Sequence, residues 1–227
     1  MENVALLDRD RTEYKGGTGA HTAVYAVEDV PVGGSAFYVV VKRLFDLVAS
    51  AAAGLVLLLP MLLIGFLIRL DSPGPALYRQ ERLGKNGKPF TLYKFRSMGL
   101  DAECDGPQWA KVDDSRCTRI GRILRASRMD ELPQLWNIFK GEMSLVGPRP
   151  ERACFYEEFS GYIKGFDKRL QVTPGLTGLA QVNGGYDLLP EEKIVYDMEY
   201  IKNRSIRMDV RCILKTVALV FSHEGAR

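Results

Sequence analysis

Hydrophobic residues are spread unevenly along the chain, and their densest run lies in its first third. Between Leu47 and Ile68 no charged residue interrupts the apolar stretch LVASAAAGLVLLLPMLLIGFLI. A helix needs roughly 20 apolar residues to cross the hydrocarbon core of a bilayer, and this run is long enough. A soluble core helix that is apolar on every side would be rare. The pattern therefore predicts a helix inserted in a membrane.

The residues around this run leave its arrangement in the membrane open. Lys42 and Arg43 precede it and Arg69 follows it, so the flanking charges give no preferred outer end. Pro60 lies near the middle, where it removes a backbone hydrogen bond and favours a kink. One arrangement is a spanning helix kinked at Pro60. The other is a helix that enters one leaflet and returns, which keeps both basic ends and the catalytic portion on the cytoplasmic face.

The pattern changes to that of a β-hairpin after the apolar run. The segments ALYRQERL and PFTLYKFRSM flank a polar turn at residues 84–88, rich in glycine and lysine. Along the second strand Leu92, Lys94 and Arg96 share one face, because side chains alternate along a strand. Two cations on one strand face indicate either a solvated surface or a phosphate-binding one.

A helical spacing follows at residues 127–140. Two acids precede a proline and an apolar run, which is typical of an ordinary helix start. The i, i+3, i+4, i+7 pattern predicts one buried helix face. Its members are Leu132, Leu135, Trp136 and Phe139.

The C-terminal segment SIRMDVRCILKTVALVF predicts an amphipathic helix. Its cations repeat at intervals of four residues, at Arg207, Arg211 and Lys215. Its apolar residues fall on another side: Ile206, Val210, Ile213, Leu214, Val217 and Phe221. Such a helix either lies on an anionic bilayer surface or packs on the core of its own domain.

These patterns divide the chain into four segments. Residues 1–36 are polar, glycine-rich and without periodicity, so they are expected to form a flexible tail. They contain no apolar signal-peptide core. Residues 37–70 form the membrane segment and residues 71–221 the catalytic domain. Residues 222–227 form a short C-terminal tail.

The composition excludes several kinds of chemistry. The chain has only two histidines, His21 and His223, both in polar terminal segments. Histidine-based nucleophile systems and histidine-rich metal sites are therefore not expected. The four cysteines lie far apart and form no CxxC pair, which speaks against a zinc site or a disulfide framework and favours reduced thiols facing the cytosol. A net charge of +3 indicates no particular partner.

An arginine series leads up to the two acids, Asp130 and Glu131. It repeats every three residues, at Arg116, Arg119, Arg122, Arg125 and Arg128. With no acid interleaved these side chains repel one another, which is expected where an anion relieves the repulsion. Cations beside carboxylates lower the carboxylate pKa, so both acids are expected to be ionised.

Taken in order, the motifs resemble those of the bacterial sugar transferase family, the monotopic phosphoglycosyl transferases that begin capsule and exopolysaccharide assembly. They are KRLFD, LYKFRSM, SRMDELPQLWNIFKGEMSLVGPRPE, TPGLTGLAQVNG and YDMEYIKN. With the membrane segment they cover about residues 38–221. The DELPQLWN…GPRP block is highly specific.

The resemblance implies an α+β fold, mainly helical and monotopic, with a re-entrant membrane helix, a small β-hairpin and an amphipathic interfacial helix. It also implies transfer of a sugar-1-phosphate from a UDP-sugar to undecaprenyl phosphate, with release of UMP. The protein would sit in the bacterial inner membrane, in contact with inner-leaflet lipids, with its catalytic domain facing the cytoplasm. The family bends its helix at a Ser-Pro pair. Here Leu59 precedes Pro60, and re-entry is still expected.

The resemblance also carries roles onto individual residues. Asp130 matches the nucleophile of the family and Glu131 its partner in the dyad, with Mg²⁺ required, so these two are the expected metal ligands. The expected phosphate-binding side chains are Lys94, Arg96, Arg125 and Arg149. Gln181 and Asn183 are expected near the nucleotide-sugar, and Asp197 and Tyr200 of the YDMEY segment are expected to support the site. Thr173 and Gly185 stand where some relatives carry arginine, which leaves the donor contacts open.

The residue types suit this chemistry. A diphosphate is strongly anionic, so an attacking carboxylate needs its charge neutralised by arginines and Mg²⁺. An aspartyl phospho-sugar intermediate would split the transfer into two displacements at phosphorus. That order suits a donor arriving from water and an acceptor arriving from lipid.

Two other interpretations are weighed against this one. In the first, the same transfer is a direct displacement and Asp130 only binds the metal. In the second, the chain is a membrane adaptor whose arginine helix grips anionic lipid or nucleic acid, which leaves the Asp-Glu pair without a purpose; no nucleic acid is expected as a partner. Glucose or galactose is the favoured sugar, but an N-acetylated or diamino sugar fits the same sequence. The polymer made and the oligomeric state, a homodimer included, stay open.

Overall fold

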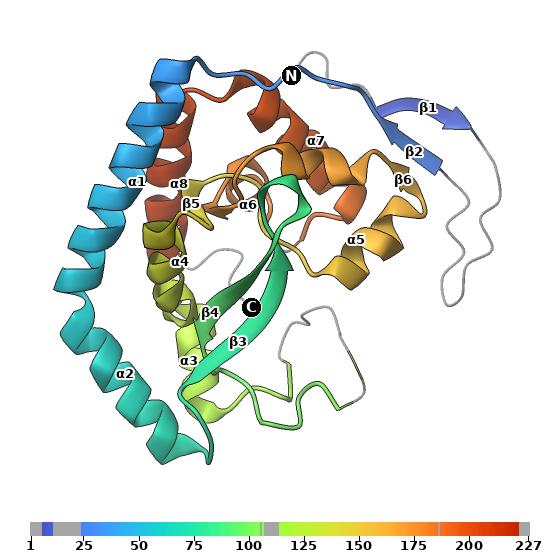
Figure 1. Ribbon diagram of the computed structural model, residues 1–227. Coiled ribbons are helices and arrows are strands. Elements are labelled where there is room, and N and C mark those ends of the chain that lie inside the picture. The colour runs from blue at the N-terminus through green and yellow to red at the C-terminus, as the bar shows by residue number, and fades with distance from the viewer. Residues whose placement is uncertain (1–5, 11–23, 105, 107–113, 186, 223–227) are drawn as a thin grey trace.

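Figure 1 shows a computed structural model of the chain, which describes residues 6–10, 24–104, 106, 114–185 and 187–222. These residues form a mixed fold of helices and three small sheets. The α-helices are α1 (Ala36–Val56), α2 (Leu58–Asp71), α3 (Arg119–Ala126), α4 (Leu135–Lys140), α5 (Ala153–Ser160), α6 (Leu179–Val182), α7 (Pro190–Asn203) and α8 (Ile206–Ser222). The 3₁₀ helices are η1 (Lys85–Gly87), η2 (Met129–Gln134) and η3 (Phe166–Gln171). The strands are β1 (Leu6–Asp10), β2 (Val24–Val27), β3 (Leu77–Leu83), β4 (Pro89–Phe95), β5 (Ser144–Val146), β6 (Ile163–Lys164) and β7 (Gly175–Thr177).

The apolar run forms two helices, α1 and α2, which meet at a bend of 61°. The break lies at Leu57, three residues before Pro60. Pro60 has no N–H to donate to Val56, and its ring clashes with that carbonyl, so α1 ends there. The ladder resumes when the N–H of Met61 donates to Leu57 O at 2.8 Å. Among the described residues no single helix is long and apolar enough to cross a bilayer, whereas this bent pair is, by length and composition.

The inner side of α1 is fixed to the domain by polar side chains. Lys42 Nζ pairs with Asp209 Oδ2 of α8 at 2.9 Å. The buried Asp46 accepts the backbone N–H of Leu145 in β5 at 3.0 Å. The guanidinium of Arg43 donates to the last carbonyls of α4, where cations suit the negative end of the helix dipole. The KRLFD motif therefore attaches α1 to three elements of the domain.

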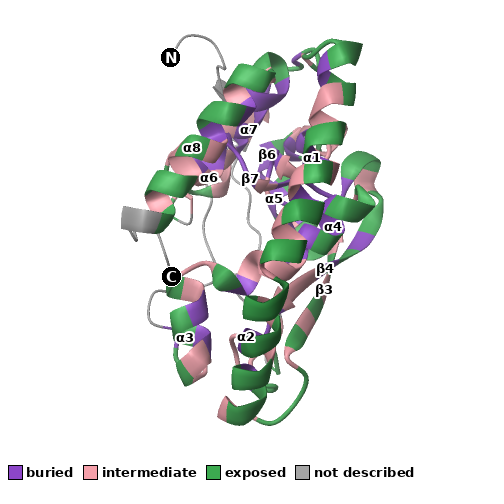
Figure 2. Cartoon of the chain, turned by 90° about the vertical axis from the view of Figure 1, so that its left-hand side faces the viewer, coloured by how far each residue is buried: buried purple, intermediate pink, exposed green. Residues whose placement is uncertain are grey.

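The outer sides of α1 and α2 remain exposed. Leu55, Val56 and Leu59, around the bend, each keep 76% of their accessible surface. Figure 2 views the molecule from this side, with the largely exposed surfaces of α1, α2, α4 and α8 turned to the viewer. Exposed apolar patches of this extent mark an interaction with a membrane or a protein.

The hairpin is confirmed as β3 and β4, an antiparallel pair in which Tyr78 lies opposite Lys94. Asn137 of α4 fixes the hairpin to the dyad region. Its side chain accepts the N–H of Tyr93 at 3.1 Å and donates to Thr91 O at 2.7 Å. Because Asn137 is fully buried, these bonds are shielded from water and set the position of β4 relative to η2 and α4.

Two of the predicted buried residues of this region are exposed. Leu135 and Ile138 are buried, but Trp136 keeps 54% of its surface and Phe139 keeps 39%. The prediction placed them on one α-helical face that began at Leu132. The chain instead makes a 3₁₀ turn through Gln134 before α4 begins, and this shifts the angular positions. The rings of Trp136 and Phe139 stack on each other outside the core.

The main core lies between α5, α7, α8, β6 and η3, and it includes part of the expected tail. Val27 and Val30 are buried in it. β2 pairs in parallel with β6, and the N–H of Gly33 donates to Ile201 O at 2.9 Å. The prediction of a flexible tail is therefore wrong for residues 24–33, because two valines and a strand edge are enough to attach them. Residues 1–5, 11–23 and 223–227 lie outside the described part.

The C-terminal helix α8 combines features of both proposed placements. Its inward side buries Asp209 and Cys212 in the domain. Its outward side exposes Ile206, Val210 and Leu214, each keeping nearly half of its surface or more. The helix thus packs on its own core and also presents an apolar stripe to the surroundings.

Candidate active site

The two acids lie in a short turn between α3 and α4. Helix α3 ends at Ala126, and Arg128 then adopts the left-handed conformation, with φ 57°. Few residues other than glycine adopt it, and such backbone strain gathers at functional sites. The left-handed residue redirects the chain so that η2 begins at Met129 and carries Asp130 and Glu131.

Glu131 binds two cations that come from distant parts of the chain. Lys94 of β4 places Nζ 2.8 Å from Oε1 of Glu131. Arg149, in the loop after β5, pairs with the same carboxylate through both terminal nitrogens. Lys94 and Arg149 were predicted to hold phosphates, and the structure brings both to the dyad.

The two acids differ sharply in electrostatics. Burial opposes ionisation of Glu131, but the guanidinium of Arg149 and the ammonium of Lys94 outweigh it and hold its pKa far below the ordinary value. For Asp130 burial dominates. It raises the pKa to about 6, although Lys94, Arg125 and Arg149 act in the opposite direction. The expectation that neighbouring cations lower both pKa values is therefore right for Glu131 and wrong for Asp130, which is 9% exposed.

Only part of the arginine series reaches the dyad. Arg125, in the last turn of α3, is close enough to lower the pKa of Asp130. Arg119 and Arg122 lie on the exposed side of that helix. Arg116 pairs with Asp114 instead. The drift of a three-residue repeat around a helix explains why the series does not converge on one site.

Arg96 lies apart from this cluster. It is 4% exposed, and its guanidinium donates to the carbonyl and hydroxyl oxygens of Ser72 at 2.7 and 2.9 Å and to Pro73 O. It therefore fixes the loop after α2 to the end of the hairpin. The strand alternation that grouped Arg96 with Lys94 does not apply, because β4 ends at Phe95.

The Pro174–Gly185 segment packs against the loop that carries Arg149. β7 pairs in parallel with β5, and the N–H of Gly147 donates to Thr177 O at 2.8 Å. The side-chain amide of Gln181 is buried, and neither its oxygen nor its nitrogen has a hydrogen-bond partner among the described residues. A buried amide without partners is costly and points to a ligand. Asn183 differs, since its amide is bound to Leu179 O and to Lys215.

Asp197 and Tyr200 do not contact the dyad. Tyr200 is buried and donates to Asp209 Oδ1 at 2.8 Å. Because Asp209 also pairs with Lys42, Tyr200 belongs to the contacts that attach α1 to the domain. Asp197 pairs with Arg169, a buried arginine that the sequence did not single out. A charged residue beside a run of polar ones gives no signal of burial, which explains the omission.

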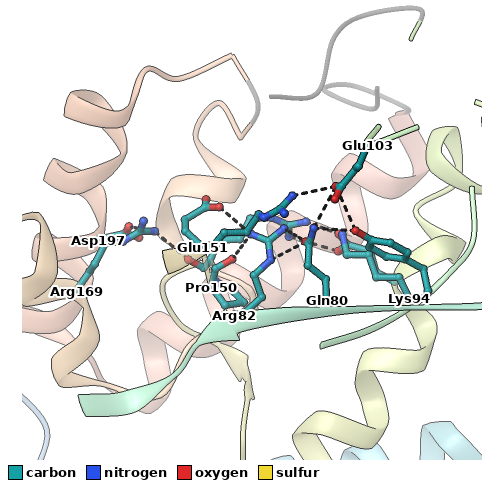
Figure 3. A network of polar contacts seen from close by, with 12 residues as sticks. Gln80, Arg82, Lys94, Glu103, Pro150, Glu151, Arg169 and Asp197 are labelled. Carbon is teal, nitrogen blue, oxygen red and sulfur yellow. Dashed lines mark hydrogen bonds and ion pairs between the residues drawn. The ribbon is translucent and has the colours of Figure 1, made fainter. Parts of the chain in front are cut away.

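A polar network extends from the dyad region along the hairpin (Figure 3). Arg82 donates to Gln80 on its own strand, and to the carbonyl of Pro150 and the carboxylate of Glu151 across the loop. Gln80 in turn donates to Tyr78, which donates to Glu103. Figure 3 shows this network reaching from Asp197 and Arg169 past Pro150 to Lys94. The hairpin face and the Arg149 loop are thus joined by side chains.

The two carboxylates of the dyad do not by themselves complete a metal site. Within the described residues no group of three or more metal-binding side chains comes together. Mg²⁺ commonly takes one or two carboxylates and completes its coordination with water and substrate phosphates. Asp130 and Glu131 fit that pattern, provided that a phosphate-bearing substrate supplies further oxygens.

Sequence comparison places this arrangement in a family. The sequence-family model described as bacterial sugar transferase matches residues 37–223, which include every residue of the site described above. The chain belongs to the bacterial sugar transferase family. The resemblance noted from the five motifs is thereby confirmed.

Named relatives of this bacterial sugar transferase carry closely related descriptions. One relative is UDP-N-acetylgalactosamine-undecaprenyl-phosphate N-acetylgalactosaminephosphotransferase of Aeromonas hydrophila. This chain is 42% identical to it over 196 residues, a match covering 85% of this chain and 46% of the relative. The chain is 44% identical over 193 residues to UDP-glucose:undecaprenyl-phosphate glucose-1-phosphate transferase of Caulobacter vibrioides, covering 82% of this chain and 71% of the relative. It is also 44% identical to the exopolysaccharide production protein PSS of Rhizobium leguminosarum, covering 78% and 94%. The chain thus spans about half the length of the Aeromonas relative.

Proposed function

We propose that this protein transfers a sugar-1-phosphate from a UDP-sugar to undecaprenyl phosphate and releases UMP, as a first step of exopolysaccharide or related glycan assembly. The observation that carries the proposal is the unequal dyad. Glu131 is held as an anion by Lys94 and Arg149, while Asp130 is buried beside it with a pKa near 6. The names of its relatives support the donor and acceptor classes.

The proposed reaction has two steps. A carboxylate oxygen of Asp130 attacks the sugar-linked phosphorus of the donor, a phosphorus–oxygen bond forms, and the bond to UMP breaks. A phosphate oxygen of the polyprenyl acceptor then attacks the same phosphorus, and the bond to Asp130 breaks. The carboxylate is restored, and the product is a polyprenyl diphosphate sugar.

The surrounding residues have distinct roles in this scheme. Burial raises the pKa of Asp130 and weakens the hydration of its carboxylate, which makes the ionised form more reactive. Arg125, Arg149 and Lys94 neutralise the charge that gathers on the donor phosphates. Gln181, whose amide has no partner among the described residues, is assigned to the nucleotide-sugar.

Mg²⁺ is the proposed cofactor, with Asp130 and Glu131 as its protein ligands. When bound, it would supply charge neutralisation to the diphosphate and the leaving group. Because Lys94 and Arg149 already pair with Glu131, we expect weak metal binding to the free protein and tighter binding with a UDP-sugar present.

We further propose that α1 and α2 enter the cytoplasmic leaflet and return, with the catalytic domain in the cytoplasm. Both arms of the bent pair pack on the domain. Asp46 of α1 binds β5, and Ile64 and Ile68 of α2 pack against Phe95. A helix whose two ends are attached to the same domain is poorly placed to cross a bilayer. The exposed apolar stripe of α8 would rest on the same inner-leaflet lipids.

The decisive experiment is the intact mass of the purified protein after incubation with Mg²⁺ and one UDP-sugar, without acceptor. UDP-glucose, UDP-galactose and UDP-N-acetylgalactosamine are tried in turn, because the relatives' names differ in the sugar. We expect a gain of one sugar-phosphate with the cognate donor, lost in Asp130→Asn. UMP release that requires acceptor, with no mass gain under rapid quench, would instead support direct displacement with Asp130 as a metal ligand. UMP release by Asp130→Asn at the wild-type rate would contradict the assignment of Asp130.

A further inference from the structure

A buried ion pair lies directly behind the loop that carries Arg149. Arg169 of η3 and Asp197 of α7 place Nη2 and Oδ2 2.7 Å apart, and the two side chains keep 2% and 1% of their accessible surface (Figure 3). The Arg169 guanidinium also lies over the ring of Phe166, with its central carbon 4.9 Å from the centroid. These contacts fix both the position and the plane of the guanidinium.

The same nitrogen reaches the active-site loop. Nη2 of Arg169 donates to the backbone carbonyl of Arg149 at 3.0 Å. One terminal nitrogen therefore connects Asp197 to the residue that pairs with Glu131. Arg149 itself stands between two prolines, so its neighbours limit its backbone freedom but provide no N–H to fix the loop from within.

The loop is instead held by donors from outside. Three successive carbonyls each accept one hydrogen bond. Pro148 O accepts from the N–H of Gly175 at 2.8 Å, Arg149 O from Arg169, and Pro150 O from Arg82 at 3.0 Å. Of these three donors, Arg169 binds the carbonyl of Arg149, and Arg149 is the residue that pairs with Glu131.

Stability gives little reason for such a pair. Removing two charges from water costs free energy that their attraction often fails to recover, and apolar replacements of similar volume are frequently neutral or stabilising. A buried pair with one donor aimed at a functional loop is better explained by the position that it imposes.

We infer that Arg169, held by Asp197, is a positioning residue that fixes the Arg149 backbone so that its guanidinium meets Glu131 and the donor phosphate. The inference rests on the proposed function for its kinetic consequence. Arg169 does not touch substrate in this scheme; it acts through Arg149.

The test replaces the pair by apolar residues, in the variant Arg169→Met/Asp197→Leu of the full chain. We expect a melting temperature close to wild type and a 10- to 100-fold lower kcat/KM for UMP release from the UDP-sugar, a range typical of a misplaced catalytic group. Arg169→Lys alone keeps the positive charge and should have a higher kcat/KM than the double variant. Lys168→Met is the matched control on the same turn, because Lys168 donates to Val27 O, away from the site. It should leave kcat/KM unchanged.

A second readout separates positioning from a loss of packing. Arg149→Met removes the guanidinium that the Arg169–Asp197 pair is inferred to position. Because the pair acts through Arg149, we expect Arg149→Met/Arg169→Met/Asp197→Leu to lower kcat/KM no further than Arg149→Met alone. Lys168→Met should leave kcat/KM unchanged with or without Arg149→Met.

The outcomes for the two proposals can be told apart. A folded double variant with wild-type kcat/KM, or one whose loss adds in full to the loss of Arg149→Met, would overturn the positioning role while leaving the transfer reaction intact. If the wild-type protein uses none of the UDP-sugars, the proposed function fails. The side-chain Nε–H resonance of Arg149 in ¹⁵N-arginine-labelled protein then decides the positioning role alone: it should shift in the double variant and stay in place in Lys168→Met. If the double variant does not fold, Arg169→Lys carries the same two measurements.

Discussion

At the residue scale, the two adjacent carboxylates of the dyad are both buried and differ in the cations that pair with them. Glu131 pairs directly with Lys94 and Arg149, whereas burial outweighs the cations around Asp130, so the two pKa values move in opposite directions. A divergence of this kind is the usual mark of two acids with different roles. In the proposed reaction, Glu131 is the anion that binds the cations and Asp130 is the reactive carboxylate.

The raised pKa of Asp130 predicts a pH dependence of the first step. Only the ionised carboxylate attacks phosphorus, so kcat/KM for UMP release should rise tenfold per pH unit below about 6 and level off above it. A profile measured from pH 4.5 to 8.5 with a fixed donor checks this. An acid limb centred near pH 4 would show that Asp130 is not destabilised by burial in the working enzyme.

The same shift predicts that Asp130→Asn stabilises the fold. The folded-state pKa of about 6 lies above the ordinary value of 3.8, so ionisation of Asp130 costs the folded state free energy once the pH exceeds both. At pH 7.5 the neutral amide avoids that cost, a gain on the order of 1–3 kcal/mol. The gain should shrink as the pH falls from 6 toward 4. Denaturant unfolding of both proteins at pH 7.5 and 4.5 measures it, and an equal difference at the two pH values would contradict the cause.

Substitution of Lys94 should lower kcat/KM more than substitution of another lysine of the hairpin. Lys94→Met removes one of the two cations on Glu131, and we expect a 10- to 100-fold loss in kcat/KM, in the range of other charge-stabilising groups. Lys88→Met, on the exposed turn of the same hairpin, is the control. Equal effects of the two substitutions on UMP release would show that only the overall charge matters.

At the element scale, the decisive feature is the break between α1 and α2. The bend needs the missing N–H of Pro60 and the steric demand of its ring on Val56. Both arms can then lie against the domain, through Asp46 on one side and Ile68 on the other. The bent pair is thus also the element that fixes β5, the strand that leads to the Arg149 loop.

Pro60→Ala is expected to straighten this element. With alanine the hydrogen-bond ladder can run through Leu57 and Val56, and a continuous apolar helix long enough to span becomes available. We expect single cysteines at positions 28 and 102, in a cysteine-free background, to react with a membrane-impermeant thiol reagent from the same side in wild type. In Pro60→Ala a fraction should react from opposite sides. An unchanged pattern would mean that packing against the domain holds the bend without proline.

At the scale of the whole molecule, four helices that carry exposed apolar residues lie on one side. Figure 2 shows α1, α2, α4 and α8 on the side that faces the viewer. Such a surface on an otherwise charged protein favours a membrane as its partner. The dyad lies in η2, which runs directly into α4.

This arrangement predicts that α8 contributes to membrane binding independently of the bent pair. Val210→Glu/Leu214→Glu places two acids on its outer stripe, and we expect weaker retention on vesicles that contain anionic phospholipid, with the fold preserved. Leu100→Glu/Leu189→Glu, two exposed apolar positions outside these four helices, tests whether any pair of acids has the same effect. Co-sedimentation and a melting curve for each variant are the measurements, and undiminished retention of the α8 variant would remove this helix from the interface.

The sequence by itself determined the local features of this protein. The uncharged run with Pro60 inside it predicted an inserted, kinked helix, and the hairpin pattern and the specific DELPQLWN…GPRP block predicted a sugar transferase with Asp130 and Glu131 at its centre. These depend on neighbours within a few positions, where covalent geometry and periodicity dominate.

Only the tertiary structure decided how these parts meet. Lys94 and Glu131 lie 37 residues apart in the chain, and Arg149 and Glu131 lie 18 apart. Whether Arg96 or Lys94 reached the dyad depended on where β4 ends, and whether Trp136 was buried depended on a 3₁₀ turn. The opposite pKa shifts and the buried Arg169–Asp197 pair follow from solvation and long-range packing, which no local pattern of residue types specifies.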